Sequence, residues 1–263
     1  MPNFGYHLAR AHGNAVRRIY AATLRPRAIA TRALDLPFEV YSYSGEDMLP
    51  EQVASIRSFF RYAGRPRKFT VVSDGTHSAR SIALLRALSV EIAALPNESS
   101  PYLATHPTGK QLALIMSLPR KAPALYIDSD VLFFAGADLA SLANGPARYL
   151  ADCRLSADER LFRSEDEKKN PVNTGVLFLP EKLNWSSGMA RLNELDGEPG
   201  FFTNQTVTHL TMHANGAEPF DPQKFVLQLD DQFIYRDKYA SPEIALRHYV
   251  NPVRHKFWTS LWP

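Results

Sequence analysis

The chain has 263 residues, 45% of them hydrophobic, which is enough to bury the core of one large domain. Its net charge is +3 and no run of about 18 apolar residues occurs, so we expect neither a transmembrane span nor, without an apolar N-terminal core, an export signal. The single cysteine, Cys153, excludes an intramolecular disulfide and a thiolate metal cluster, so a reducing, cytoplasmic compartment is the expected location.

The N-terminal segment is strongly basic. Residues 1–34 contain no acidic residue but six arginines, Arg10, Arg17, Arg18, Arg25, Arg27 and Arg32. We expect residues 1–36 to form a basic helical extension and residues 37–263 to form a single domain. The extension suits a helix lying over the domain, a transit peptide, or a peripheral contact with a membrane or a partner. No basic stripe with interleaved aromatic residues occurs elsewhere, so nucleic acid is not an expected partner.

Strand and helix patterns alternate through the first half of the chain. Runs rich in β-branched and aromatic residues predict strands at 37–45, 67–75 and 124–134. Apolar residues at helical spacing predict helices at 48–64, 78–88 and 108–119. This alternation is typical of an α/β fold with a largely parallel sheet that is covered on both faces.

Polar residues stand at the ends of these three strands. They are Ser42 and Tyr43, then Asp74, then Asp128 and Asp130. Because ligands of open α/β sheets bind at the carboxyl ends of the strands, we expect these side chains to converge on one cleft.

The segment "ALYIDSDVLFF" (124–134) places Asp128 and Asp130 inside an apolar run. Residues at i and i+2 of an extended chain point to the same face, so both carboxylates can reach one cation. Hard divalent ions such as Mg²⁺ and Mn²⁺ prefer oxygen ligands, often carboxylates together with substrate phosphates. A pair of turn or helix-capping aspartates is the alternative interpretation.

The same segment resembles the DxD motif of nucleotide-sugar glycosyltransferases with the GT-A fold, in particular glycosyltransferase family 8 and its relatives. Three further matches follow the family's order: Lys110 before the DxD strand, "VNTGVLFL" (172–179) and "RHYVNPVRHKFW" (247–258). Together they span residues 37–258. The resemblance implies a GT-A fold, which is a Rossmann-like, mixed and mostly parallel sheet flanked by helices.

The resemblance also implies roles for individual residues. Asp128, Asp130 and His248 would bind Mn²⁺ or Mg²⁺. The donor would be held by Ser42, Tyr43 and Asp74 at the nucleotide, Lys110 and Asn173 at the sugar, and Lys256 at the diphosphate.

The C-terminal segment departs from the family pattern, because the interval from His248 to Lys256 is two residues longer. Arg254 is therefore an alternative to Lys256, since a guanidinium grips phosphate oxygens through two N–H groups. His255 is likewise an alternative to His248 as the metal ligand.

Two segments compete for the family's catalytic Asp-Gln-Asp position. The first is "FFTNQTVTHL" (201–210), which contains Asn204 and Gln205, and the second is "LDDQF" (229–233), which contains Asp230 and Asp231. A retaining reaction needs only an amide near the anomeric carbon, whereas an inverting one needs a carboxylate base. The resemblance favours retention, with Gln205 at the sugar and Asp231 in reserve.

The function implied is metal-dependent transfer of a sugar from a nucleotide-sugar, by resemblance a UDP-sugar, to a hydroxyl of a glycan, a lipid or a small molecule. A phosphohydrolase of the haloacid dehalogenase type is one alternative, because it also uses an Asp-x-Asp strand end, although its motif stands nearer the start of the domain. A sugar nucleotidyltransferase would need a Gly-rich loop after the first strand, and this sequence has only one glycine there. An inactive scaffold that binds a nucleotide-sugar also stays open.

Overall fold

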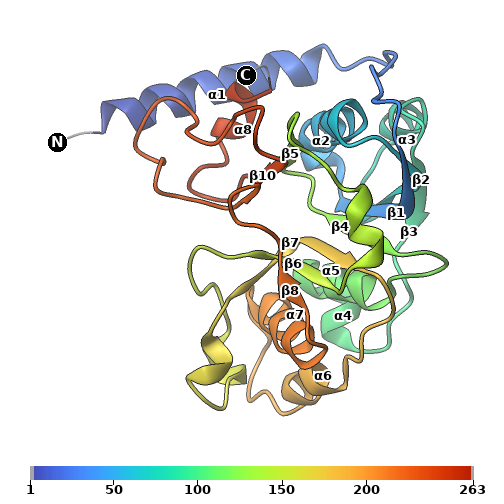
Figure 1. Cartoon of the computed structure of the whole chain (residues 1–263), viewed down its shortest axis with the longest axis vertical. Coiled ribbons are helices and arrows are strands. Elements are labelled where there is room, and N and C mark those ends of the chain that lie inside the picture. Colours follow the sequence, from blue (N-terminus) through green and yellow to red (C-terminus); the bar gives the residue numbers. More distant parts are fainter. Residues whose placement is uncertain (1–2, 262–263) are drawn as a thin grey trace.

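The main sheet has seven strands in the order β3-β2-β1-β4-β7-β6-β8. The computed structural model describes residues 3–261 (Figure 1). Strands β3, β2, β1 and β4 are parallel, whereas β7 is antiparallel to both β4 and β6. The strands are β1 Asp35–Ser44, β2 Arg65–Ser73, β3 Glu91–Ala94, β4 Ala124–Ile127, β6 Arg148–Ala151, β7 Val172–Leu179 and β8 Glu218–Pro219.

A second sheet of three short strands has the order β5-β10-β9. These strands are β5 Val131–Phe133, β9 Phe225–Val226 and β10 Leu246–His248. The helices of the chain are α1 Phe4–Ala22, α2 Leu49–Tyr62, α3 Ala79–Arg86, α4 Pro101–Thr105, α5 Pro107–Met116, α6 Ser186–Asn193, α7 Thr203–Ala214 and α8 Lys256–Thr259.

Helices cover both faces of the main sheet, because successive side chains of a strand point to opposite sides. In β4, Leu125 and Ile127 join the hydrophobic core under α2 and α3, whereas Ala124 and Tyr126 join the core under α5 and α7. Every residue of β4 is buried. The predicted α/β class, with a mixed, mostly parallel sheet flanked by helices, is confirmed.

The apolar run 124–134 is split between the two sheets. Strand β4 ends at Ile127, residues 128–130 turn, and β5 then pairs antiparallel with β10. In this pairing Val131 lies opposite His248. The turn therefore brings the end of β10 beside the two aspartates, although about 120 residues separate them in the sequence.

Helix α1 lies along the upper edge of the molecule in Figure 1, next to α8. Gly13 permits this contact, because a Cβ atom there would lie 2.2 Å from the carbonyl oxygen of His255. The Arg17 guanidinium also donates two hydrogen bonds to the Glu51 carboxylate of α2, at 2.6 and 3.0 Å. A basic helix thus packs on the domain, while the boundary at residues 36 and 37 stays a prediction.

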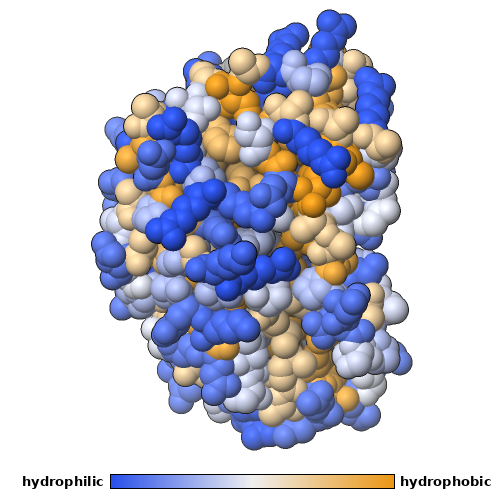
Figure 2. All heavy atoms as spheres, turned by 90° about the vertical axis from the view of Figure 1, so that its right-hand side faces the viewer, coloured by the Kyte–Doolittle hydropathy of each residue, from blue (hydrophilic) through white to orange (hydrophobic). Residues whose placement is uncertain are grey.

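The surface is mixed in character. On the side shown in Figure 2, hydrophobic residues form patches in the upper half that strongly hydrophilic side chains separate. Within residues 3–261, no helix combines the length and the apolar character that crossing a bilayer demands.

Candidate active site

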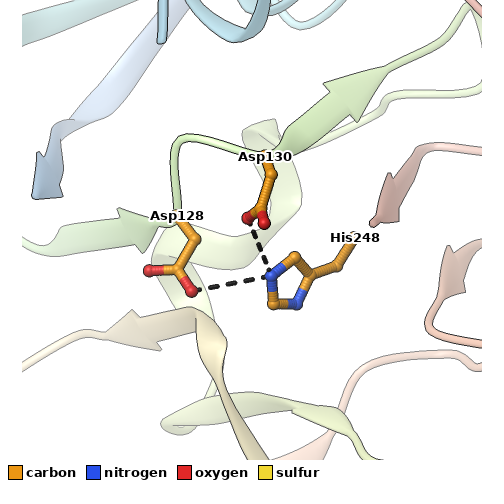
Figure 3. A group of neighbouring side chains, drawn as sticks. All are labelled: Asp128, Asp130 and His248. Carbon is orange, nitrogen blue, oxygen red and sulfur yellow. Dashed lines mark hydrogen bonds and ion pairs between the residues drawn. The ribbon is translucent and has the colours of Figure 1, made fainter. Parts of the chain in front are cut away.

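Asp128, Asp130 and His248 form one cluster at the junction of the two sheets (Figure 3). One ligand atom from each residue lies within 4.8 Å of the other two. The His248 Nε2 atom is 3.1 Å from Asp130 Oδ1 and 3.5 Å from Asp128 Oδ2. Two carboxylates and one imidazole are donors that suit Mn²⁺ and leave positions for phosphate oxygens.

The orientation of the His248 ring is set by Asn173 on β7. The Asn173 Oδ1 atom accepts a hydrogen bond from the Gly175 N–H at 2.9 Å and lies 3.0 Å from His248 Nδ1. Since that oxygen can only accept, the Nδ1 atom carries the proton, and Nε2 faces the two carboxylates. In this tautomer the lone pair of a neutral imidazole at Nε2 points toward the Asp128 and Asp130 carboxylates. The three side chains could therefore bind one divalent cation between them, so the residues present fit such an ion.

Gly175 leaves the space that the His248 ring occupies. A Cβ atom at position 175 would lie 2.1 Å from His248 Cε1 and 2.4 Å from its Nδ1 atom. Such distances are far inside van der Waals contact, so any side chain would displace the ring. This requirement explains the glycine in "VNTGVLFL".

Burial and charge act differently on the two aspartates. Burial raises the pKa of Asp128 above its ordinary value, and the nearby Asp130 carboxylate adds to this effect. Burial acts in the same direction on Asp130, but His248 and the Arg254 guanidinium outweigh it and lower the pKa of that carboxyl. The Arg254 Nη2 atom donates to Asp130 Oδ2 at 2.6 Å. The cluster therefore places two buried carboxylates close together, and a bound cation would favour the charged form of both.

Two neighbours that the sequence interpretation missed hold Asp128 in place. The Tyr126 hydroxyl and the Gln111 Nε2 atom donate to Asp128 Oδ1 at 2.7 and 2.9 Å, which leaves Oδ2 facing His248. Tyr126 could have been found from strand alternation, because it stands two residues before Asp128. Gln111 is one residue after Lys110, which does not line the cleft beside the cluster.

That cleft has a volume of about 500 Å³ and reaches from the cluster of Asp128 and His248 to the start of α7. At its far side the Gln205 Nε2 atom donates to Asp152 Oδ2 at 3.0 Å and to the Ser156 carbonyl oxygen at 2.8 Å. The Asn173 Nδ2 atom lies 3.4 Å from the same Asp152 oxygen. The structure thus brings Asn173 and Gln205 together, and it adds Asp152, a carboxylate that the sequence interpretation did not single out.

Asn204 also lines the cleft, one residue before Gln205. Its Nδ2 atom donates to Gln111 Oε1 at 2.9 Å, and its Oδ1 atom accepts from the Gln205 N–H at 2.7 Å. Asn204 therefore connects α7 to the Gln111 side chain that holds Asp128.

The three residues predicted to hold the nucleotide lie at the carboxyl edge of the parallel strands but outside this cleft. Ser42 is buried and its hydroxyl donates to Gln52 Oε1 at 2.9 Å. Asp74 is half-buried, and its Oδ1 atom accepts from the N–H and hydroxyl of Thr76 at 2.8 and 2.6 Å. Tyr43 is partly exposed and stands two residues beyond Tyr41, the last residue of β1 that pairs with β4, where Tyr41 lies opposite Tyr126. Of the three residues it is the one whose register in the parallel pair points toward the turn that contains Asp128.

Asp231 and Lys256 are not brought to the cluster. Both side chains are fully buried, and the Lys256 Nζ atom lies 3.2 Å from Asp231 Oδ2. Asp231 accepts two hydrogen bonds of 2.8 Å from the Arg247 guanidinium, while Lys256 donates to two backbone carbonyls of the 231–237 loop. Burial alone would raise the pKa of Asp231, but Arg247 and Lys256 lower it. The ion pairs hold the 231–237 loop in place, and neither Asp231 nor Lys256 lines the cleft.

Replacement of Arg247 by methionine should destabilise the protein by about 3–5 kcal/mol, because it leaves the buried Asp231 and Asp237 carboxylates without their main partner. Urea unfolding measures this loss. The matched control is Arg236→Met on the exposed side of the same loop, which should change stability by less than about 0.5 kcal/mol. Equal stabilities of the two variants would contradict the structural role given to Arg247.

Comparison with known proteins shows where this architecture occurs. No family model and no curated protein sequence matches the chain. The solved structure of the galactosyltransferase LgtC, in complex with donor and acceptor sugar analogs, matches with a TM-score of 0.57 at 13% identity and covers 85% of this chain and 95% of LgtC. The chain has the GT-A fold.

Two further GT-A structures agree. The glycosyltransferase GlyE of Streptococcus pneumoniae TIGR4 matches with a TM-score of 0.55 at 16% identity, over 87% of this chain and 61% of GlyE. The bifunctional glycosyltransferase WbbM matches with a TM-score of 0.57 at 14% identity, over 89% of this chain and 50% of WbbM. At these identities the likeness establishes the GT-A fold, and assignment to family 8 in particular stays a prediction.

Proposed function

We propose that the protein is a metal-dependent glycosyltransferase that moves a sugar from a nucleotide-sugar to an acceptor hydroxyl. The observation that carries this proposal is the Asp128, Asp130 and His248 cluster, which opens into a cleft lined by Asn173 and Gln205. The GT-A fold of the chain supports it, since three similar structures are of glycosyltransferases.

The cluster would hold Mn²⁺ or Mg²⁺ through Asp128 Oδ2, Asp130 Oδ1 and His248 Nε2. When bound, such an ion supplies positive charge to the diphosphate leaving group. Arg254 would support the same group from the protein side, because its side chain is 46% exposed and only one of its N–H groups faces Asp130. We thus assign to Arg254 the diphosphate role that the resemblance suggested for the buried Lys256.

The sugar would lie between the metal cluster and α7. Asp152 Oδ2 accepts hydrogen bonds from Gln205 and Asn173, and Oδ1 accepts from the Arg154 N–H at 3.2 Å. A second lone pair on Oδ1 could accept from a sugar hydroxyl. The Gln205 Oε1 atom accepts a hydrogen bond from Asn173 Nδ2 at 3.5 Å, and its second lone pair would serve the sugar side of the cleft. An amide oxygen in that place stabilises positive charge at the anomeric carbon, which supports a retaining reaction.

The nucleotide and the acceptor would occupy opposite ends of this arrangement. Tyr43 is the residue best placed to contact the base and ribose of a UDP-sugar, with Asp74 further along the same edge. The exposed aromatic side chains of Phe201 and Phe202 stand at the other end of the cleft, where they offer an apolar surface to a sugar ring of the acceptor.

The haloacid dehalogenase alternative does not agree with this geometry. A nucleophilic aspartate must be free to attack, yet Asp128 Oδ1 accepts two hydrogen bonds and Oδ2 faces His248. The Asp-x-Asp segment also follows the fourth strand of the chain, β4, whereas the haloacid dehalogenase motif stands near the start of its domain. An inactive scaffold would bind a nucleotide-sugar without turning it over.

A thermal-shift screen identifies the ligand. Nucleoside diphosphates and their sugars should raise the melting temperature in the presence of Mn²⁺, and a ligand at 100 times its dissociation constant stabilises the native state by about 2.7 kcal/mol. The same ligands without metal should produce a smaller shift. If every nucleoside diphosphate leaves the melting temperature unchanged with Mn²⁺ present, the donor assignment fails.

A further inference from the structure

Helix α1 carries a second apolar face whose side chains are exposed among the described residues. One face, which includes Ala9, Gly13 and Tyr20, is turned to the domain, where the Tyr20 ring lies 5.2 Å from that of Trp258. The exposed face falls within an arc of about 80° at 100° per residue. It consists of Phe4, Leu8, Ala11, Ala15, Ile19 and Ala22.

The loop between β9 and β10 extends this apolar face. Phe233, Ile234 and Tyr235 are 54%, 49% and 40% exposed. The loop adjoins α1, because the Tyr235 hydroxyl lies 2.8 Å from the His12 Nδ1 atom and the two rings stack. Of the large hydrophobic side chains that are exposed within residues 3–261, six of nine therefore belong to one surface, which we call the α1 surface.

Exposed basic side chains lie on α1 and directly after it. Residues 3–34 contain no acidic residue. Arg10 and Arg18 on the helix, and Arg25 and Arg27 just after it, are exposed. Among the described residues none of these four forms an ion pair with a carboxylate, in contrast to Arg17. The α1 surface thus combines apolar side chains with uncompensated positive charge.

We propose that the α1 surface binds the anionic face of a lipid bilayer, with α1 lying in the plane of the interface. Large apolar side chains beside arginines are the composition of such interfacial helices, which insert shallowly and do not span the membrane. The absence of acidic residues favours a uniformly anionic partner over a protein surface of mixed charge.

Membrane binding through α1 does not depend on the proposed catalysis, but it would determine where the cleft lies relative to the bilayer. Gly13 of α1 touches His255, the residue next to Arg254 of the candidate active site. Binding through α1 would therefore hold the cleft at a fixed, short distance from the bilayer, within reach of an acceptor that is carried by a lipid.

Co-sedimentation of the full chain with vesicles tests the proposal without any activity assay. We expect the protein to pellet with an equimolar mixture of phosphatidylcholine and phosphatidylglycerol, and to stay in solution with phosphatidylcholine alone. The triple variant Phe4→Ser, Leu8→Ser, Ile19→Ser should bind at least about tenfold more weakly. The double variant Arg10→Gln, Arg18→Gln should lose roughly fivefold for each arginine.

Leu155→Ser provides the control, since Leu155 is an exposed apolar residue outside the α1 surface. It should bind as the wild type does, and circular dichroism melts should show that all variants fold. Failure of the wild type to bind anionic vesicles, or unchanged binding by the triple variant, would overturn the proposal. So would a dimer without vesicles that the triple variant abolishes, because the α1 surface would then serve a second copy of the chain.

Discussion

Replacement of Asp130 by alanine is expected to abolish metal-dependent release of the nucleoside diphosphate from the donor. Asp130 is buried and is the carboxylate that both His248 and Arg254 contact, at 3.1 and 2.6 Å. Its loss would remove one of the proposed metal ligands and the carboxylate that holds Arg254 beside the proposed diphosphate position. Because a bound metal contributes several kcal/mol to the stabilisation of the leaving group, the rate should fall by roughly 1,000-fold or more.

The control for this variant is Asp138→Ala, which removes an exposed carboxylate from the segment after β5 and should keep full activity. Asp130→Asn keeps the shape of the side chain but not its charge, and it should be nearly as inactive as the alanine variant. A variant at position 130 that folds and keeps wild-type turnover would show that Asp130 is not a metal ligand.

Replacement of Gly175 by alanine should weaken Mn²⁺ binding by about 10- to 100-fold, although Gly175 supplies no ligand atom. The new methyl group would lie within the space of the His248 ring, 2.1 Å from Cε1, so the imidazole must turn away from Asp128 and Asp130. Isothermal titration with Mn²⁺, or the electron paramagnetic resonance signal of the free ion, measures the affinity.

Gly200→Ala is the matched control, because a Cβ atom at position 200 has no neighbour within 4 Å. It should bind Mn²⁺ as tightly as the wild type. Tight Mn²⁺ binding by Gly175→Ala would mean that His248 is not one of the ligands, and it would favour a site made of the two aspartates alone.

Much of the fold follows from local patterns in the sequence. The strands predicted at 37–45 and 67–75 and the helix predicted after each of them lie close to β1, β2, α2 and α3, because apolar periodicity reflects burial directly. The single strand predicted at 124–134 is wrong, because the chain turns at residues 128–130 and forms two strands, β4 and β5. Two charged side chains that a buried strand cannot hold without a partner account for this turn. The sequence could not reveal that β5 leaves the main sheet, because its partner β10 is about 115 residues away.

Residues of the candidate site can be predicted from the sequence where they belong to a motif. They cannot be predicted where only tertiary packing brings them to the site. Asp128, Asp130 and His248 come together as the sequence suggested, since each stands at a strand end. Asp231 and Lys256 resemble functional residues in sequence, but in the structure they form a buried network of ion pairs in which Asp231 contacts both Lys256 and Arg247.

Other parts of the site have no local signature. Asp152 and Gln111 carry no motif, and they join the site only because α5, β6 and α7 converge in three dimensions. Arg254 was an alternative in the sequence, and only its contact with Asp130 distinguishes it from Lys256. Side chains that act through distant contacts can be assigned only once the fold is known.

The most direct test of the central claim is turnover of a panel of nucleotide-sugars by the wild-type protein, with Mn²⁺ and then with EDTA. Release of a nucleoside diphosphate, by hydrolysis or by transfer to a sugar acceptor, is measured in both conditions. A metal-dependent glycosyltransferase should release the diphosphate from at least one donor in Mn²⁺ and lose this activity in EDTA. Full activity in EDTA, or no turnover of any donor that binds, would contradict it.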